Sequence, residues 1–304
     1  MPRPIRFGYQ LTRQQENDPI AAAKRAEQIG FNTFLVSDHF GSGRAPMPTL
    51  AAVAAATSSI RLGTFVLNTD MRNPVQLAWE AATIDHLSGG RFELGLGAGH
   101  TPQEYGATGI EFRVPADRKA DLAEQVEIIR RLLAGDSVTH NGTHHRLSEA
   151  EIDRSLQERL PILVGGNGNA LLSHAGAHAD IVGLQGLGRT LEDGHRHDVK
   201  WSAEWLDTQL EQIRSGAAER FAEIELNALV QHVEVTDDAA GAIEAFCERV
   251  GTVVAADVAT TPYVLIGTVE EIVEKITTCR DRWGISYFAA RELDDFAPII
   301  EAFR

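Results

Sequence analysis

The chain alternates short apolar runs with longer amphipathic stretches, and this alternation constrains its fold more than any other feature. Helical patterns separate most of the apolar runs, which is typical of repeated βα units with parallel strands. The runs that predict strands lie at 5–9, 33–37, 60–67, 92–97, 161–164, 181–184, 225–235 and 286–290. Eight strands is the count of a (β/α)8 barrel, and a chain of 304 residues fits one such unit. The sequence therefore predicts a single TIM-barrel domain over residues 1–304.

Several helix ends can be identified from the residues that cap them. Asp18-Pro19 begins the first helix as N-cap and first helical residue, and Gly30 ends it. Asn73-Pro74 begins the third helix in the same way. An open doubly wound sheet is the competing α/β architecture, but the GxGxxG that usually follows its first strand is missing. The barrel is therefore the favoured architecture.

Two stretches interrupt the alternation, at 136–160 and 186–205. In a TIM barrel the chemistry lies at the C-terminal ends of the strands, where insertions often form lids or hairpins. We expect both stretches to shape the pocket. Trp201 and Trp205 in the second stretch either form an aromatic wall of that pocket or anchor a helix to the barrel.

Composition argues against several functional classes. Nucleic-acid binding needs clustered Lys and Arg, whereas this chain has a formal net charge of −15, which still permits a local anion site. Cys247 and Cys279 lie in separate predicted helices, so neither a disulfide framework nor a CxxC metal site is expected. The sequence has no signal-peptide pattern and no apolar run of the roughly 18 residues that a membrane span needs. We expect a cytoplasmic protein without membrane association.

Two ionisable residues directly follow the second predicted strand. Asp38 and His39 stand in the motif SDHF, at the C-terminal end of that strand and so at the catalytic face of a barrel. An imidazole transfers protons near neutral pH, and an adjacent carboxylate can orient it or bind a ligand hydroxyl. The alternative is that Asp38 caps a turn and His39 is a surface histidine. The motif alone leaves both interpretations open.

A glycine-rich turn, PILVGGNGN at 161–169, joins the fifth predicted strand to a helix. Glycines let the backbone approach an oxyanion, and the amides of the first helical turn point at it with a favourable dipole. A phosphate group is the ligand that suits this arrangement best, although many such turns bind no ligand.

Two further segments carry a resemblance to a known family. The strand RLGTFVLN leads into TDMRNP, a helix and the block ATIDHLSGGRFELGLGAG. This order resembles the third and fourth βα units of the bacterial-luciferase-like oxidoreductases, which use a flavin or a deazaflavin. The similarity extends from FGYQ in the first strand, through AKRAEQIGFNTFLVSDHF, to GISYFAARELDDFAPII. The resemblance implies an oxidoreductase that transfers a hydride between coenzyme F420, a deazaflavin, and a small organic substrate.

The resemblance also assigns roles to particular residues. Asp38 is expected to meet the deazaflavin ring system, and His39 to face the substrate as a proton-transfer group, with His100 as a second candidate. A non-prolyl cis peptide is expected between Phe65 and Val66, where it would brace the middle of the ring. The other expected cofactor contacts are Asn68 beside the pyrimidine edge, Gly97, Ala98 and Gly99 lining the cofactor, and Gly165, Gly166, Asn167 and Arg189 around the phosphate.

The sequence departs from some members of this family. Certain deazaflavin-dependent sugar-phosphate dehydrogenases have Glu where His100 stands, and Trp shortly after SDHF, where GSGRAP stands in this chain. Both differences lie at substrate positions. Sugar-phosphate chemistry and its acid–base assignment are therefore not carried over.

Three alternatives remain open. An FMN-dependent monooxygenase uses the same barrel and usually a flavin reductase partner, but SDHF favours F420. A non-redox barrel that binds a phosphate ligand would need only the glycine-rich turn. A metal enzyme is suggested by His140, His144, His145, His195 and His197, but no adjacent acidic pair completes a ligand set, so we expect no metal. The family resemblance also leads us to expect a homodimer.

Overall fold

A closed parallel barrel forms the centre of the computed structural model, which describes residues 2–11, 17–41, 43–190 and 197–304, without the side chains of 189, 190 and 197. The strands follow one another around the barrel in chain order, and the last of them pairs with the first. Their bounds are β1 (Arg6–Gln10), β2 (Thr33–Val36), β3 (Arg61–Thr64), β4 (Leu67–Asn68), β5 (Phe92–Gly97), β8 (Ile162–Gly165), β9 (Ile181–Leu184), β12 (Glu225–Leu229) and β15 (Ile285–Ala290). Because β3 and β4 are two halves of one barrel position, the predicted eight-stranded barrel is confirmed.

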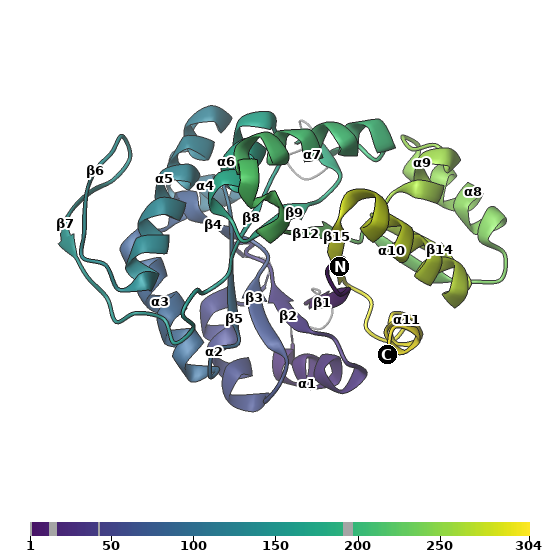
Figure 1. Ribbon diagram of the computed structural model, residues 1–304, viewed down its shortest axis with the longest axis horizontal. Helices are drawn as coiled ribbons and strands as arrows, with labels where there is room; N and C mark the ends of the chain where they lie inside the picture. Colours follow the sequence, from purple (N-terminus) through teal and green to yellow (C-terminus); the bar gives the residue numbers. More distant parts are fainter. Residues whose placement is uncertain (1, 12–16, 42, 191–196) are drawn as a thin grey trace.

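Helices surround the strands on the outside (Figure 1). Those of the βα units are α1 (Pro19–Ile29), α2 (Pro46–Ala56), α3 (Pro74–Leu87), α5 (Pro115–Ala134), α6 (Asn169–His178), α7 (Ala203–Ala217) and α10 (Val269–Trp283). The others are α4 (Pro102–Thr108), α8 (Ala239–Val250), α9 (Ala255–Thr260), α11 (Ala297–Ala302) and the 3-10 turns η1 (Thr69–Met71) and η2 (Ala218–Glu223). No helix in the described part of the chain has both the length and the apolar character of a membrane-spanning segment.

The predicted helix ends are present. The Asp18 side chain accepts a hydrogen bond from the amide of Ala21, and Gly30 ends α1 in the left-handed conformation with a φ of 105°. Asn73 caps α3 by accepting from the amides at its first turn. Local capping chemistry therefore sets where these helices begin and end.

One predicted strand is wrong as a single element. The run 225–235 divides into β12 and β13 (His232–Val235), and only β12 belongs to the barrel. β13 pairs in parallel with β14 (Val264–Gly267), which was not predicted, in a small sheet beside α8 and α9 (Figure 1). The direction changes because Val230 donates to Ala289 in the barrel, whereas Gln231 donates to Tyr263 just before β14.

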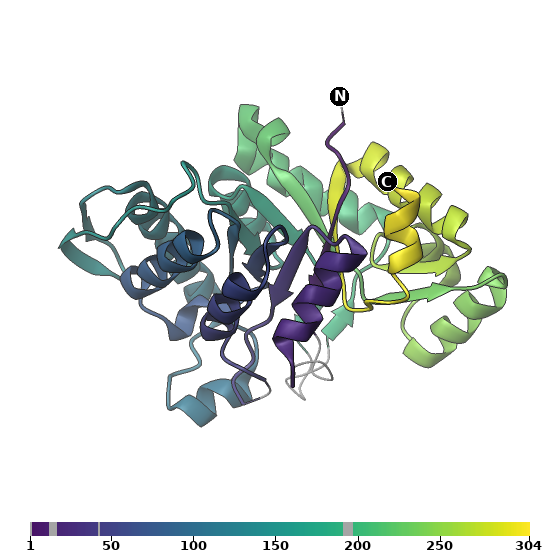
Figure 2. The same ribbon diagram turned by 90° about the horizontal axis from the view of Figure 1, so that it is seen from below.

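The expectation that the insertion at 136–160 shapes the pocket is also wrong. It forms an antiparallel hairpin, β6 (Val138–Asn141) and β7 (Arg146–Ala150), at the outer edge of the molecule beside α5 (Figures 1 and 2). Hydrogen bonds hold it there, because His140 and His145 bond to Glu124 and Asp121 of α5 at 2.9 and 2.6 Å. The second insertion contains a short antiparallel pair, β10 (Leu187–Thr190) and β11 (His197–Val199).

A buried ion cluster closes the N-terminal end of the barrel. Glu93 of β5, which is only 3% exposed, binds Arg6 of β1 at 2.7 Å and Arg61 of β3 at 2.5 Å. Arg6 also binds Glu225 of β12 at 2.6 Å and lies over the ring of Tyr287 in β15. Burial by itself would raise the pKa of Glu93, but the charges of Arg6 and Arg61 lower it. The cluster therefore connects four barrel strands through ion pairs and a fifth through the ring of Tyr287.

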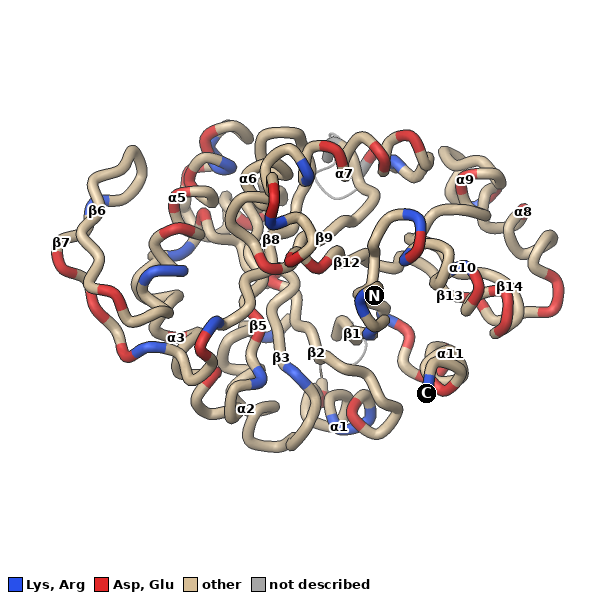
Figure 3. Tube along the Cα trace, in the orientation of Figure 1, with Lys and Arg blue, Asp and Glu red and all other residues tan. Residues whose placement is uncertain are grey.

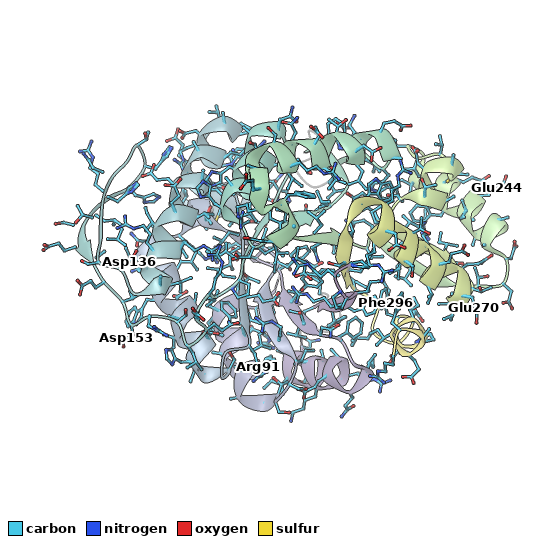
Figure 4. The ribbon with its side chains drawn as sticks, viewed as in Figure 1. Arg91, Asp136, Asp153, Glu244, Glu270 and Phe296 are labelled. Carbon is cyan, nitrogen blue, oxygen red and sulfur yellow. The ribbon has the colours of Figure 1, made fainter. Side chains whose placement is uncertain are left out.

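Other polar and aromatic contacts fix the outer layer to the barrel. The guanidinium of Arg91, which is labelled in Figure 4, donates to the carbonyls of Ala54, Thr57 and Ile60 around the end of α2. Phe296, at the start of α11, packs against Phe7 with ring centroids 5.4 Å apart. These contacts satisfy helix-terminal carbonyls and seal the C-terminal helix onto β1.

We expect Glu93→Gln to destabilise the protein by about 3 kcal/mol, because it leaves two partly buried guanidiniums without their shared, fully buried carboxylate. The folded state lowers the pKa of Glu93, so its stabilising contribution is present at neutral pH and is lost as the pH falls below the ordinary carboxyl range. Urea unfolding at several pH values measures both effects. The matched control is Glu80→Gln on the exposed face of α3, and an equal effect of the two variants would contradict the role of the cluster.

Candidate active site

A cavity of about 1240 Å³ opens at the C-terminal ends of the barrel strands. This volume exceeds the roughly 300–1,000 Å³ of a typical small-molecule pocket, so the cavity has room for two ligands. Its lining includes a residue at or just after the end of every barrel position: Gln10, Asp38, Asn68, Gly97, Gly165, Gln185, Leu229 and Arg291. The catalytic face of the fold is therefore hollowed, and side chains from distant parts of the chain meet there.

The predicted site residues come together at this cavity, with one exception. The side chain of Arg189 lies outside the described residues, and its backbone belongs to β10. The lining contains Asp38, His39, Phe65, Val66, Asn68, Gly97, Ala98, Gly99, His100, Gly165, Gly166 and Asn167. Their shared location agrees with the prediction, while their individual roles remain predictions.

The expected cis peptide joins Phe65 and Val66, between β3 and β4. The carbonyl of Phe65 accepts a hydrogen bond from Nε2 of Gln10 at 3.0 Å. Val66 reaches the cavity wall because β5 carries glycine opposite it, and a Cβ on Gly97 would lie 2.5 Å from Cγ2 of Val66. Val66 thus forms an apolar shelf against which a flat ligand can lie.

Asp38 connects the end of β2 to the end of β4. Its carboxylate accepts two hydrogen bonds from the guanidinium of Arg72, at 2.5 and 2.9 Å, and one from the amide of Asn68 at 2.8 Å. A bidentate arginine pair of this kind fixes the carboxylate geometrically. Asp38 therefore lines the cavity as an oriented, already paired anion.

His39 is paired with an acid that the sequence analysis did not identify. Nδ1 of His39 lies 2.8 Å from Oε1 of Glu104 in α4, the short helix that projects from one end of the barrel (Figure 2). The hydrogen bond to Glu104 raises the pKa of His39, burial and Arg291 lower it, and the charges of Glu104 and Asp38 raise it further. The ring of His100 meets that of His39 edge-on, with centroids 5.7 Å apart. The result is an imidazole that holds its proton more firmly than an ordinary histidine.

The glycine-rich turn forms an anion-binding end of the cavity. Gly168 has a φ of 101° and begins α6 without a side-chain cap, so backbone amides supply the donors at this helix end. Lys119 of α5 reaches the same turn, since a Cβ on Gly168 would lie 2.8 Å from its ammonium nitrogen. Burial and the neighbouring Arg118 lower the pKa of Lys119. These groups together suit a phosphate.

The cavity is locally cationic although the chain is acidic. Acidic residues are spread over the outer elements, including β7, α8 and α10 (Figure 3). Among the described residues of the lining, Asp38 and Glu104 are paired with Arg72 and His39, and Asp198 is the remaining acid. Four lining cations have no carboxylate within 4.0 Å among the residues that the structure describes: Arg118, Lys119, Lys200 and Arg291. The cavity therefore favours an anionic ligand.

The second insertion contributes to the lining, but its two tryptophans separate. Trp205 in α7 lines the cavity, as do Leu187, Gly188 and Lys200. Trp201 is instead buried, with its ring 6.0 Å from that of Phe246. Trp205 thus contributes to the cavity wall, whereas Trp201 packs against α8, outside the barrel.

The histidines of the insertions do not converge on a metal site within the described residues. His140 and His145 pair with acids of α5, His195 lies outside the described residues, and so does the side chain of His197. A different group, Glu127, His174 and His178, has ligand atoms within 4.8 Å of one another on the outer helices. The expectation of no metal remains a prediction.

Comparisons with known proteins agree with this arrangement. The profile of the family described as luciferase-like monooxygenase matches residues 4–250. F420-dependent glucose-6-phosphate dehydrogenases of Amycolatopsis mediterranei (strain U-32) and Microbacterium testaceum (strain StLB037) are 31% and 33% identical, over 69% and 58% of this chain. The matched segments span 66% and 55% of those relatives, less than two thirds of their length. The coenzyme F420-dependent tetrahydromethanopterin reductase of Methanopyrus kandleri has the same fold, with a TM-score of 0.77 and 20% identity over 99% of this chain and 100% of that chain.

We expect Glu104→Gln to lower the pKa of His39, because it removes the hydrogen bond and the charge that raise it. The His39 imidazole will then lose its proton at a lower pH than in the wild type. An NMR titration of the imidazole resonances measures this shift directly. Glu111→Gln, at an exposed position that follows α4, is the control and should leave the titration unchanged. An unchanged His39 titration in the Glu104 variant would show that the pair has no electrostatic role.

Proposed function

Because the chain belongs to the luciferase-like monooxygenase family, we propose that it is an F420-dependent oxidoreductase that transfers a hydride between the deazaflavin and a small organic substrate. The observation that carries the proposal is the meeting, in one cavity, of a phosphate-binding turn, the Val66 shelf and the His39–Glu104 pair. The relatives named F420-dependent, at 31–35% identity, support the choice of cofactor.

The residues present fit a cofactor with a flat ring and a phosphate. The amides after Gly166 and Gly168 and the ammonium of Lys119 would hold the phosphate. Val66 would support the ring, and Asn68, whose side-chain amide is already oriented by the hydroxyl of Tyr105 at 3.2 Å, would stand beside it. The lining cations suit a cofactor that carries several negative charges.

When bound, the deazaflavin supplies a two-electron hydride exchange at its C5 carbon. His39 holds and moves the coupled proton at Nε2, while Glu104 fixes the ring through Nδ1 and stabilises the imidazolium. Asp38, held by Arg72, favours the same charged state through its own charge. The walls of the cavity orient the substrate and exclude water from the transfer.

The purified protein is expected to bind F420 with micromolar affinity and to bind FMN much more weakly. Fluorescence titration with each cofactor measures this, and tight FMN binding without F420 binding would overturn the proposal in favour of an FMN monooxygenase.

We expect Lys119→Met to weaken F420 binding about tenfold, because a charge-assisted contact to the phosphate is lost. Lys24→Met, on the exposed face of α1, is the matched control.

A further inference from the structure

Arg291 is a cavity cation that the cofactor-binding end does not use. It directly follows β15, and its guanidinium reaches the cavity lining. Nε donates to Oε1 of Gln10 at 2.8 Å, and Nη1 donates to Oε1 of Gln231 at 3.1 Å. Both acceptors are neutral amide oxygens. Within residues 2–11, 17–41, 43–190 and 197–304, Nη2 of Arg291 has no hydrogen-bond partner and no carboxylate lies within 4.0 Å of the guanidinium.

A largely buried guanidinium without an opposite charge at contact distance is unfavourable. Burial lowers the pKa of Arg291, and the charge of Glu292 opposes this effect, but Glu292 is itself buried enough to have a raised pKa. The carboxylate of Glu292 accepts from the backbone amide of Arg291 at 3.1 Å and not from its guanidinium. An anion that enters the cavity would accept hydrogen bonds from the guanidinium of Arg291, whose planar arrangement of N–H donors matches a carboxylate or phosphate in shape.

The barrel topology separates Arg291 from the phosphate-binding turn. β15 lies between β12 and β1, whereas the turn follows β8, so two strands, β9 and β12, stand between them on the shorter way around. Arg291 is instead nearer to the proton-transfer pair, because both residues line the cavity and only one strand, β1, stands between β15 and β2, the strand that His39 follows. An anion bound at Arg291 would thus lie on the His39 side of the cavity, apart from Lys119.

Gln10 connects Arg291 to the shelf that would support the cofactor ring. Its Oε1 accepts from Arg291, and its Nε2 donates to the carbonyl of Phe65 at 3.0 Å. The two bonds fix the orientation of the amide and place the guanidinium relative to the Phe65–Val66 segment. Arg291 is therefore held in position before any ligand binds.

We propose that Arg291 is the substrate-binding residue of this site and that the substrate carries an oxyanion, a carboxylate or a phosphate, which its guanidinium binds next to His39. The proposal rests on the proposed function, because it assigns the substrate class of the same cavity. It makes Arg291 a specificity-determining residue: the anion fixes one end of the substrate, so the carbon that exchanges the hydride lies beside the imidazole.

Calorimetric titration of the F420-saturated protein tests the proposal with three probes: glucose 6-phosphate, succinate and neutral glucose. We expect one or both anions to bind and glucose not to bind. Arg291→Gln should weaken anion binding at least tenfold. Arg291→Lys should retain part of the affinity, because the ammonium keeps the positive charge but lacks the planar guanidinium that can donate two hydrogen bonds to one anion. Binding of glucose 6-phosphate alone assigns a phosphate-bearing substrate, and binding of succinate alone assigns a carboxylate.

Two controls separate this proposal from the proposed function. Arg291→Gln should leave F420 affinity within about twofold, whereas Lys119→Met should weaken F420 and leave anion binding to the F420-saturated protein unchanged. If F420 does not bind, the proposed function fails, and the same anion titrations on the cofactor-free variants still test Arg291. Anion binding that is unchanged in Arg291→Gln, or that is lost only in Lys119→Met, would overturn the assignment.

Discussion

The carboxylate of Glu93 is the contact on which the barrel depends, because two guanidiniums from different strands share it inside the protein. Together with Glu225 it satisfies Arg6 at the N-terminal end, where the strands begin. Charged groups at such a position are favourable only when each has its partner, and the cluster joins β1 to β5 and to β12, strands that are not its neighbours in the sheet. With this end closed by ion pairs, the opposite end of the strands is left to form the cavity.

Features governed by local chemistry could be predicted from the sequence. The barrel strands and the ends of α1 and α3 follow from apolar periodicity and from capping residues a few positions away. The position of the hairpin β6–β7 could not be predicted, because it depends on hydrogen bonds with α5, such as that between His145 and Asp121, which no periodic pattern reveals. The run 225–235 was misread because apolar periodicity continues where β13 leaves the barrel for β14.

The candidate site was predictable to the extent that its residues stand at strand ends or in family motifs. Asp38 and His39 could be predicted because they stand at the end of a strand, and the Phe65–Val66 cis peptide because the sequence resembles the family. Glu104 was missed because it reaches His39 from a helix 65 residues further along the chain. Arg291 obeys the same strand-end rule as Asp38, so the signal was present in ISYFAAR. Among the described residues, its guanidinium donates to two neutral amide oxygens, and this arrangement is visible only in the folded structure.

Glu104, which raises the pKa of His39, belongs to α4, a helix of seven residues outside the barrel wall, whereas His39 follows a barrel strand. This arrangement has a thermodynamic consequence. A displacement of α4 that separates Glu104 from the imidazole removes the largest contribution that raises its pKa. The proton affinity of His39 and the position of α4 are then thermodynamically linked. Protonation of His39 favours the position in which Glu104 contacts the imidazole, and movement of α4 away from it favours release of the proton. The barrel supplies a fixed frame for the chemistry, while a peripheral turn of helix decides how readily a proton can leave.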